Sequence, residues 1–148
     1  MPQVKNSKIV SFPIETIYKT VIDIEGYPKI LSFIQDLKIL EKSENELKAR
    51  VSVGLPFFQF SYDCKVTFLE NEFVKIDMIS GPFKKLHAEW VFERTTDINK
   101  TKINYYLDSE FKNPLIEAAS GVIFASQLNH SIKAFEEAIG EQIKSKCS

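Results

Sequence analysis

Hydrophobic and polar residues alternate with a period of two through the middle of the chain, over residues 34–111. Such alternation is typical of strands that are buried on one face only. Short turns, polar or containing Pro, interrupt it at residues 43–46, 55–57, 70–72, 81–82 and 96–100. The pattern predicts six consecutive strands joined as an antiparallel meander with one apolar face.

The alternation also assigns side chains to the two faces of this sheet. We expect a run of aromatic and aliphatic residues on the apolar face: Phe58, Phe60, Tyr62, Cys64, Val66, Phe68, Val74, Ile76, Met78, Leu86, Ala88, Trp90, Phe92, Ile103, Tyr105, Leu107 and Phe111. His87, Asp108 and Glu110 fall on the polar face. General acid–base chemistry by the two carboxylates would require burial, which this placement denies.

Both ends of the chain show helical spacing instead. A short strand at residues 8–12 leads into Pro13, a favoured first helical residue, and apolar residues then recur at three and four as far as Ile22. A second short helix is expected from Pro28. Near the other end, Asn113 is a good N-cap and Pro114 a good first helical residue.

The segment after Asn113 keeps this spacing to about residue 143. The apolar positions are Leu115, Ala118, Ala119, Val122, Ala125, Leu128, Ile132, Phe135, Ala138 and Ile139. They predict one continuous helix, roughly 45 Å long at 1.5 Å per residue. The order of elements predicts an α+β fold, with a curved antiparallel sheet wrapped around a long C-terminal helix and two short helices after the first strand. With 148 residues, we expect a single domain over residues 1–148.

Composition narrows the possible partners. The formal net charge is −1, and Arg50 and Arg94 are the only arginines, so no general attraction to nucleic acid is expected and DNA is excluded as a partner. The two cysteines, Cys64 and Cys147, stand in no metal-ligand spacing with the two histidines, so no metal is expected. Without a signal peptide or a membrane-spanning apolar run, we expect a cytoplasmic protein with free thiols.

Three runs resemble a known family. They are residues 26–31 (Gly-Tyr-Pro-Lys-Ile-Leu), residues 81–86 (Gly-Pro-Phe-Lys-Lys-Leu) followed by Trp90-Val91-Phe92, and Ala134-Phe135. They are similar to the coenzyme Q-binding START-like proteins, a group that includes polyketide cyclases, lipid transport proteins and RatA-type ribosome association toxins. The resemblance implies a helix-grip fold with a hydrophobic cavity between the sheet and the C-terminal helix. This chain departs from the family pattern at Ile30 and Ser32, where Phe and Pro are usual.

With that resemblance, part of the apolar face becomes a candidate binding site for ubiquinone or a related lipid. The expected ligand-binding residues are Phe58, Phe60, Tyr62, Met78, Leu86, Trp90, Phe92, Tyr105, Phe124, Leu128 and Ile132. The alternative from the residues alone is plain core packing. We expect the cavity mouth at Tyr27, Leu31, Phe33, Phe57 and Phe83. There, Phe83 would insert into a membrane surface beside Lys84 and Lys85, or the aromatic residues would merely anchor the hairpins.

These observations lead to three function hypotheses. The first is non-catalytic binding or transport of ubiquinone or a related isoprenoid lipid in support of respiration, with no cofactor beyond this ligand and with transient contact at the inner membrane face. The alternative is a RatA-type toxin that contacts the ribosome and blocks association of its subunits. The third is a polyketide cyclase or aromatase, for which the sequence offers no catalytic constellation.

Overall fold

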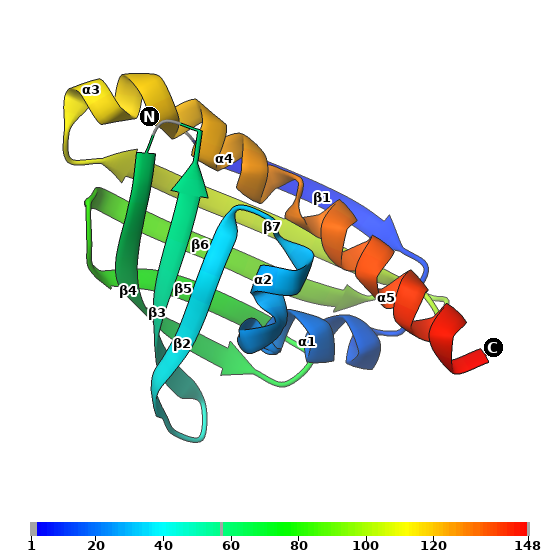
Figure 1. Cartoon of the computed structure of the whole chain (residues 1–148). Helices are drawn as coiled ribbons and strands as arrows, with labels where there is room; N and C mark the ends of the chain where they lie inside the picture. Colours follow the sequence, from blue (N-terminus) through cyan, green and yellow to red (C-terminus); the bar gives the residue numbers. More distant parts are fainter. Residues whose placement is uncertain (1–2, 57, 148) are drawn as a thin grey trace.

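The computed structural model describes the backbone of residues 3–56 and 58–147, and the side chains within that range up to Glu141. Seven strands in this part of the chain form one antiparallel sheet in the order β1-β7-β6-β5-β4-β3-β2 (Figure 1). The strands are β1 (Gln3–Val10), β2 (Ile34–Lys42), β3 (Glu46–Leu55), β4 (Phe58–Leu69), β5 (Phe73–Ser80), β6 (Phe83–Arg94) and β7 (Thr101–Phe111). The predicted α+β class and the six-strand meander are confirmed.

The first strand is longer than the sequence indicates. It begins at Gln3 rather than Lys8, because it pairs along its whole length with β7, from Gln3 opposite Asp108 to Val10 opposite Thr101. Val10 is the one fully buried residue of β1, so no apolar alternation marks the strand in the sequence. This pairing makes β1 and β2 the two edges of the sheet.

Short helices follow β1, as predicted. Helix α1 (Ile14–Ile22) is followed by a 3-10 turn, η1 (Ile24–Gly26), and by the four-residue helix α2 (Tyr27–Ile30). Tyr18 of α1 packs edge-to-face on Phe92 of β6, with ring centroids 6.0 Å apart. The Tyr27 hydroxyl donates a hydrogen bond to the carbonyl of Val21, which fastens α2 to the end of α1.

The C-terminal segment crosses the open side of the sheet, but it is not one continuous α-helix (Figure 1). It consists of α3 (Pro114–Ile116), a π-helical segment η2 (Glu117–Gly121), α4 (Val122–Asn129) and α5 (Ser131–Cys147). Asn113 caps it as expected, its side chain accepting from the backbone N–H of Leu115 at 2.8 Å. A turn at His130 separates α4 from α5, where the Ser131 hydroxyl donates to the carbonyl of Leu128 at 2.5 Å.

The predicted single apolar stripe along this helix was wrong, because the π-helical segment η2 interrupts it. Its i→i+5 hydrogen bonds advance each residue by a smaller angle than the 100° of an α-helix, so the apolar positions at and around it do not form one continuous stripe that faces the sheet. Leu115 and Val122 are 80% and 73% exposed, whereas Phe124 and Ala125 are buried against the sheet. The carboxylate of Glu117 folds back over Gly121 and accepts from the backbone N–H of Phe111 at 3.0 Å.

The core lies between the concave face of the sheet and the helices. The residues of β3 and β7 alternate strictly between buried and less buried positions, and those of β6 do so from Lys85 to Phe92, as period-two alternation requires. No helix in the described parts of the chain is both long enough and apolar enough to cross a membrane.

Candidate ligand-binding cavity

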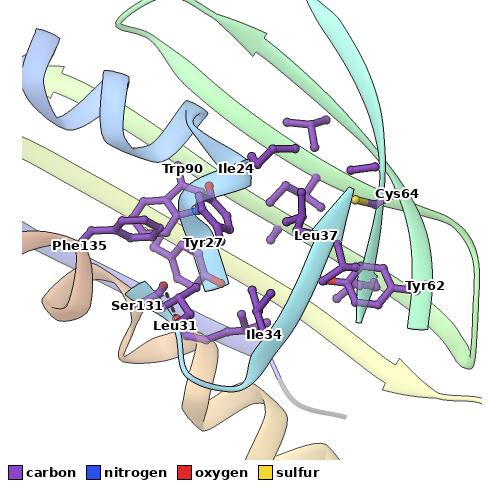
Figure 2. Close-up of a pocket in the computed structure, with 18 residues that line it drawn as sticks. Ile24, Tyr27, Leu31, Ile34, Leu37, Tyr62, Cys64, Trp90, Ser131 and Phe135 are labelled. Carbon is purple, nitrogen blue, oxygen red and sulfur yellow. Dashed lines mark hydrogen bonds between the residues drawn. The ribbon is translucent and has the colours of Figure 1, made fainter. Parts of the chain in front are cut away.

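A cavity of about 50 Å³ lies between the concave face of the sheet and the helical segments η1, α2, α4 and α5 (Figure 2). By volume it accommodates a few water molecules. Side chains from six strands and four helical segments line it: Ile24, Tyr27, Leu31, Ile34, Leu37, Ala49, Val51, Tyr62, Cys64, Val66, Ile76, Leu86, Ala88, Trp90, Tyr105, Leu128, Ser131 and Phe135.

Aromatic rings form one end of this cavity. The ring of Phe135 on α5 lies 5.3 Å from Trp90 and 5.2 Å from Tyr27, both edge-to-face. Tyr105 of β7 completes the group, 4.9 Å from Trp90. Figure 2 shows Tyr62 at the opposite end, away from Trp90, Tyr27 and Phe135. The cavity is therefore elongated along the sheet, with Leu31 and Ile34 on the side that α2 and the start of β2 cover.

The polar atoms of the cavity wall are few and uncharged. Burial raises the pKa of the Tyr27 and Tyr62 hydroxyls well above the ordinary value, and it raises that of Tyr105 although Ser131 partly offsets the effect. Burial also raises the pKa of the Cys64 thiol to about 12. All four groups are neutral near pH 7, and none of the described lining residues is Asp, Glu, His, Lys or Arg.

Tyr62 and Trp90 each bring a hydrogen-bond donor to the set of residues that line the cavity. Among the described residues, neither the Tyr62 hydroxyl nor the Trp90 indole nitrogen makes a side-chain hydrogen bond, and neither is completely shut off from solvent, since the one such buried polar atom without a partner is Asp108 Oδ1. The Tyr27 hydroxyl, by contrast, is engaged by the Val21 carbonyl. A buried donor is stabilised when it finds an acceptor, so this wall favours an apolar molecule that carries oxygen acceptors.

Beyond Tyr62 the interior is filled by an aromatic cluster made of Phe58, Phe60, Phe83, Phe111 and Phe124. The rings of Phe83 and Phe111 stack with centroids 4.4 Å apart, and Phe83 lies 5.6 Å from Tyr62. Phe83 is completely buried. The expectation that it forms a cavity mouth was wrong, because the hairpin turns its ring inward, and of the two alternatives its burial agrees with anchoring of the hairpin rather than with insertion into a membrane.

The structure brings together some of the other expected site residues. Tyr62, Leu86, Trp90, Tyr105 and Leu128 line the cavity. Tyr27 and Leu31 also line it, but as buried wall residues rather than as an exposed mouth. The remaining expected residues pack elsewhere in the core and do not line the cavity: Phe58, Phe60, Met78, Phe92, Phe124, Ile132 and, from the expected mouth, Phe33. Phe57 lies outside the described residues.

Several lining residues were not among the expected ones. Cys64, Val66, Ile76 and Ala88 were correctly assigned to the inner face, but alternation does not tell how far along a strand a cavity lies. Ser131 and Phe135 belong to the stripe of the C-terminal helix that begins at Leu128, and this spacing of three and four was the signal that could have found them.

The outer face of the sheet carries a cluster of titratable groups around His87. His87 lies between two carboxylates, with Nδ1 2.5 Å from Asp77 and Nε2 2.7 Å from Glu89. Partial burial lowers the pKa of His87, but the hydrogen bonds and charges of both carboxylates outweigh it, and the pKa is raised. Lys85 pairs with Asp108 at 3.2 Å. The predicted outward placement of His87, Asp108 and Glu110 is confirmed, and the sheet separates them from the cavity.

Comparison with known proteins supports this architecture. A family model described as "Polyketide cyclase / dehydrase and lipid transport" matches residues 10–136. The ribosome association toxin RatA of Escherichia coli strain K12 is 30% identical over 135 residues, covering 91% of this chain and 85% of the toxin. The mitochondrial coenzyme Q-binding protein COQ10 of Dictyostelium discoideum is 30% identical over 138 residues, covering 91% of this chain and 67% of that protein.

A solved structure shows the same fold. A START superfamily protein from Mycobacterium smegmatis superposes with a TM-score of 0.80 at 22% identity, over 95% of this chain and 98% of its own. The predicted helix-grip arrangement of a curved sheet around a C-terminal helical segment is thereby confirmed.

Proposed function

This chain belongs to the polyketide cyclase/dehydrase and lipid transport family, and on this premise we propose that it binds a neutral hydrophobic molecule of the isoprenoid quinone class without converting it. The observation that carries the proposal is the cavity wall, which is apolar and uncharged yet presents the donors of Tyr62 and Trp90. A quinone ring offers carbonyl acceptors to such donors, and its apolar tail suits the aliphatic side chains between them.

Binding of such a molecule requires the cavity to widen, because about 50 Å³ does not hold a prenylated ring. The elements most suited to move are η1 and α2, which together span residues 24–30 and cover the cavity with Ile24 and Tyr27. A four-residue helix has little stability of its own, so its position depends on the few contacts of Tyr27. We infer that this segment is the cover that a ligand displaces.

The composition of the cavity wall also disfavours catalysis on a bound ligand. A cyclase needs a group that gives or takes a proton near neutral pH, and a catalytic pKa close to the operating pH is most effective. The titratable groups of the cavity are tyrosines and Cys64, whose pKa values burial raises. This supports binding or transport rather than cyclase or aromatase activity.

The fluorescence of Trp90 provides a test of the proposed binding. Trp90 is the only tryptophan of the chain and lines the cavity, so a short-tailed quinone bound there should quench its fluorescence saturably. Tyr62→Phe removes one donor and should weaken binding about fivefold to tenfold, corresponding to the roughly 1 kcal/mol of one hydrogen bond. Tyr106→Phe, on the outer face, is the matched control and should bind like the wild type. Quenching that never saturates would contradict the proposal.

A second candidate function is supported by the 30% identity to RatA over most of both chains. It is a contact with the ribosome that interferes with subunit association. Since the net charge is −1, we expect little salt-resistant co-sedimentation with ribosomal subunits, because phosphate neutralisation normally dominates affinity for RNA. Stoichiometric binding to a free subunit at physiological salt, with loss of joined ribosomes, would establish this second function instead.

A further inference from the structure

A stripe of apolar side chains faces solvent along α3, η2 and α4. Its members, Leu115, Ala118, Ala119 and Val122, are spaced by three and four residues and are all exposed. Among the described large hydrophobic residues, only Ile98 has an exposed fraction comparable to those of Leu115 and Val122. Ile98 stands singly in the turn between β6 and β7, whereas the stripe is continuous. We call these four residues the outer stripe.

Charged side chains do not interrupt the outer stripe. Between Lys112 and Lys133, the only Asp, Glu, Lys or Arg in the sequence is Glu117. Its carboxylate is turned toward the sheet, where it accepts from the backbone N–H of Phe111. A solvent-facing helix surface normally carries charged and polar residues. The absence of charge on this one indicates that its working environment includes an apolar phase.

Lysines border one end of the outer stripe. Lys112 immediately precedes the helix and is exposed, and its backbone N–H donates to the carbonyl of Pro82 at 2.8 Å. This contact places the β5–β6 turn, and with it the largely exposed Lys84, at the same end. The ion pair between Lys84 and Glu110 is long, at 3.9 Å, so Lys84 remains available to an external anion.

We propose that the outer stripe is a docking surface for an anionic lipid bilayer. An apolar helix face bordered by lysines is the arrangement by which amphipathic helices lie in the bilayer interface, with lysines among the lipid phosphates. The proposal rests on the proposed function, because a protein that carries a membrane-dissolved molecule must reach the bilayer. The cavity residues Leu128 and Ser131 continue the same helical segment, so docking brings the cavity close to the lipid (Figure 1).

Charge favours a bilayer over a second copy of this chain. In an antiparallel pair of outer stripes, Lys112 of one copy would face residues 123–127 of the other, which contain no acidic side chain. In a parallel pair the lysines of the two copies would face each other. Neither arrangement provides a partner for the lysines, whereas lipid phosphates do.

Flotation with vesicles of phosphatidylcholine and phosphatidylglycerol tests the proposal. The wild type should float with the vesicles, and Leu115→Ser with Val122→Ser should lower the bound fraction about tenfold, since two apolar side chains no longer leave water. Ile98→Ser is the matched control, equally exposed but outside the outer stripe, and should float like the wild type. Lys84→Gln with Lys112→Gln should reduce binding to these vesicles but not to vesicles of phosphatidylcholine alone.

Two outcomes would overturn the docking proposal. One is unchanged flotation of the double serine variant. The other is a wild type that does not bind vesicles but sediments as a dimer, while the double serine variant sediments as a monomer. Trp90 quenching by a short-tailed quinone, measured without vesicles, keeps the two proposals distinguishable. Saturable quenching without flotation removes only the docking surface, and flotation without quenching removes the quinone site.

Discussion

At the scale of single residues, His87 shows how a surface group makes stability depend on pH. Its ring bridges Asp77 and Glu89, and the raised pKa means that the folded protein holds this proton more tightly than the unfolded chain. The stabilisation is therefore fully present below the unfolded pKa of about 6.5 and is lost as pH rises through the folded pKa. Asp108, opposite His87 on β7, adds a further negative group on the same face.

We expect His87→Gln to reduce the free energy of unfolding by about 0.5–1 kcal/mol at pH 6 and by less at pH 9, since partly exposed ion pairs are worth little more. Urea unfolding at both pH values measures the difference. His130→Gln, at an exposed turn position, is the control substitution at the other histidine. A larger effect at pH 9 than at pH 6 would mean that the His87 ring is neutral in the folded protein.

Because Cys64 is buried in the cavity wall, the reactivity of its thiol measures how accessible the cavity is. Its thiol lines the cavity, and burial raises its pKa to about 12, so the reactive thiolate is scarce. In a Cys147→Ser background, we expect Cys64 to react with an aromatic disulfide reagent at pH 8 far more slowly than a free thiol. A bound short-tailed quinone should slow the reaction further. Reaction at the rate of an exposed cysteine would show that the α2 segment does not close the cavity.

At the scale of elements, the sheet was predictable and the C-terminal segment only partly so. Period-two alternation reports which face a residue occupies, and it placed Trp90 and His87 on opposite faces correctly. The helix has spacing of three and four throughout, so its sequence indicates one apolar stripe. The stripe divides at the π-helical segment η2, where Glu117 accepts from the backbone N–H of Phe111, a contact that local periodicity cannot show.

This contact leads to a prediction for the helix. Glu117→Ala leaves the backbone N–H of Phe111 without its carboxylate acceptor, and loss of such a charged hydrogen bond costs about 1.5–3 kcal/mol. We expect chemical denaturation to show destabilisation of this size. Glu137→Ala, an exposed position on α5, should change stability by less than about 0.5 kcal/mol. Equal effects of the two substitutions would mean that Glu117 does not hold the π-helical segment in place.

At the scale of the whole molecule, the position of the cavity depends on how the interior is filled along the sheet. The sequence predicted that aromatic residues of β4, such as Phe58 and Phe60, would surround a ligand. They instead pack with Phe83, Phe111 and Phe124, and the cavity begins at Tyr62. Phe58, Phe60 and Tyr62 lie on the same strand and the same face of the sheet. Only the three-dimensional arrangement therefore distinguishes the residues of the packed core from the residue of the cavity wall.

Strand β3 runs from the cavity wall into the packed core, and two of its valines are a matched pair of positions for substitution. Val51 lies opposite Tyr62 and lines the cavity, whereas Val53 lies opposite Phe60 and does not line it. Both are buried valines on the same face, two residues apart. Val51→Ile adds a methylene into free space and should leave the free energy of unfolding unchanged or slightly increased. Val53→Ile adds it to a packed interior, where overpacking costs about 1–3 kcal/mol.

Ligand binding should show the reverse order. Val51→Ile occupies volume that the ligand needs and should weaken Trp90 quenching by a short-tailed quinone several-fold, while Val53→Ile should leave the affinity near that of the wild type. Denaturation and fluorescence titration on the same two variants thus separate stability from binding. If both substitutions destabilise the protein equally and neither changes quenching, the space beside Val51 behaves as core, and the quinone-binding proposal loses its site.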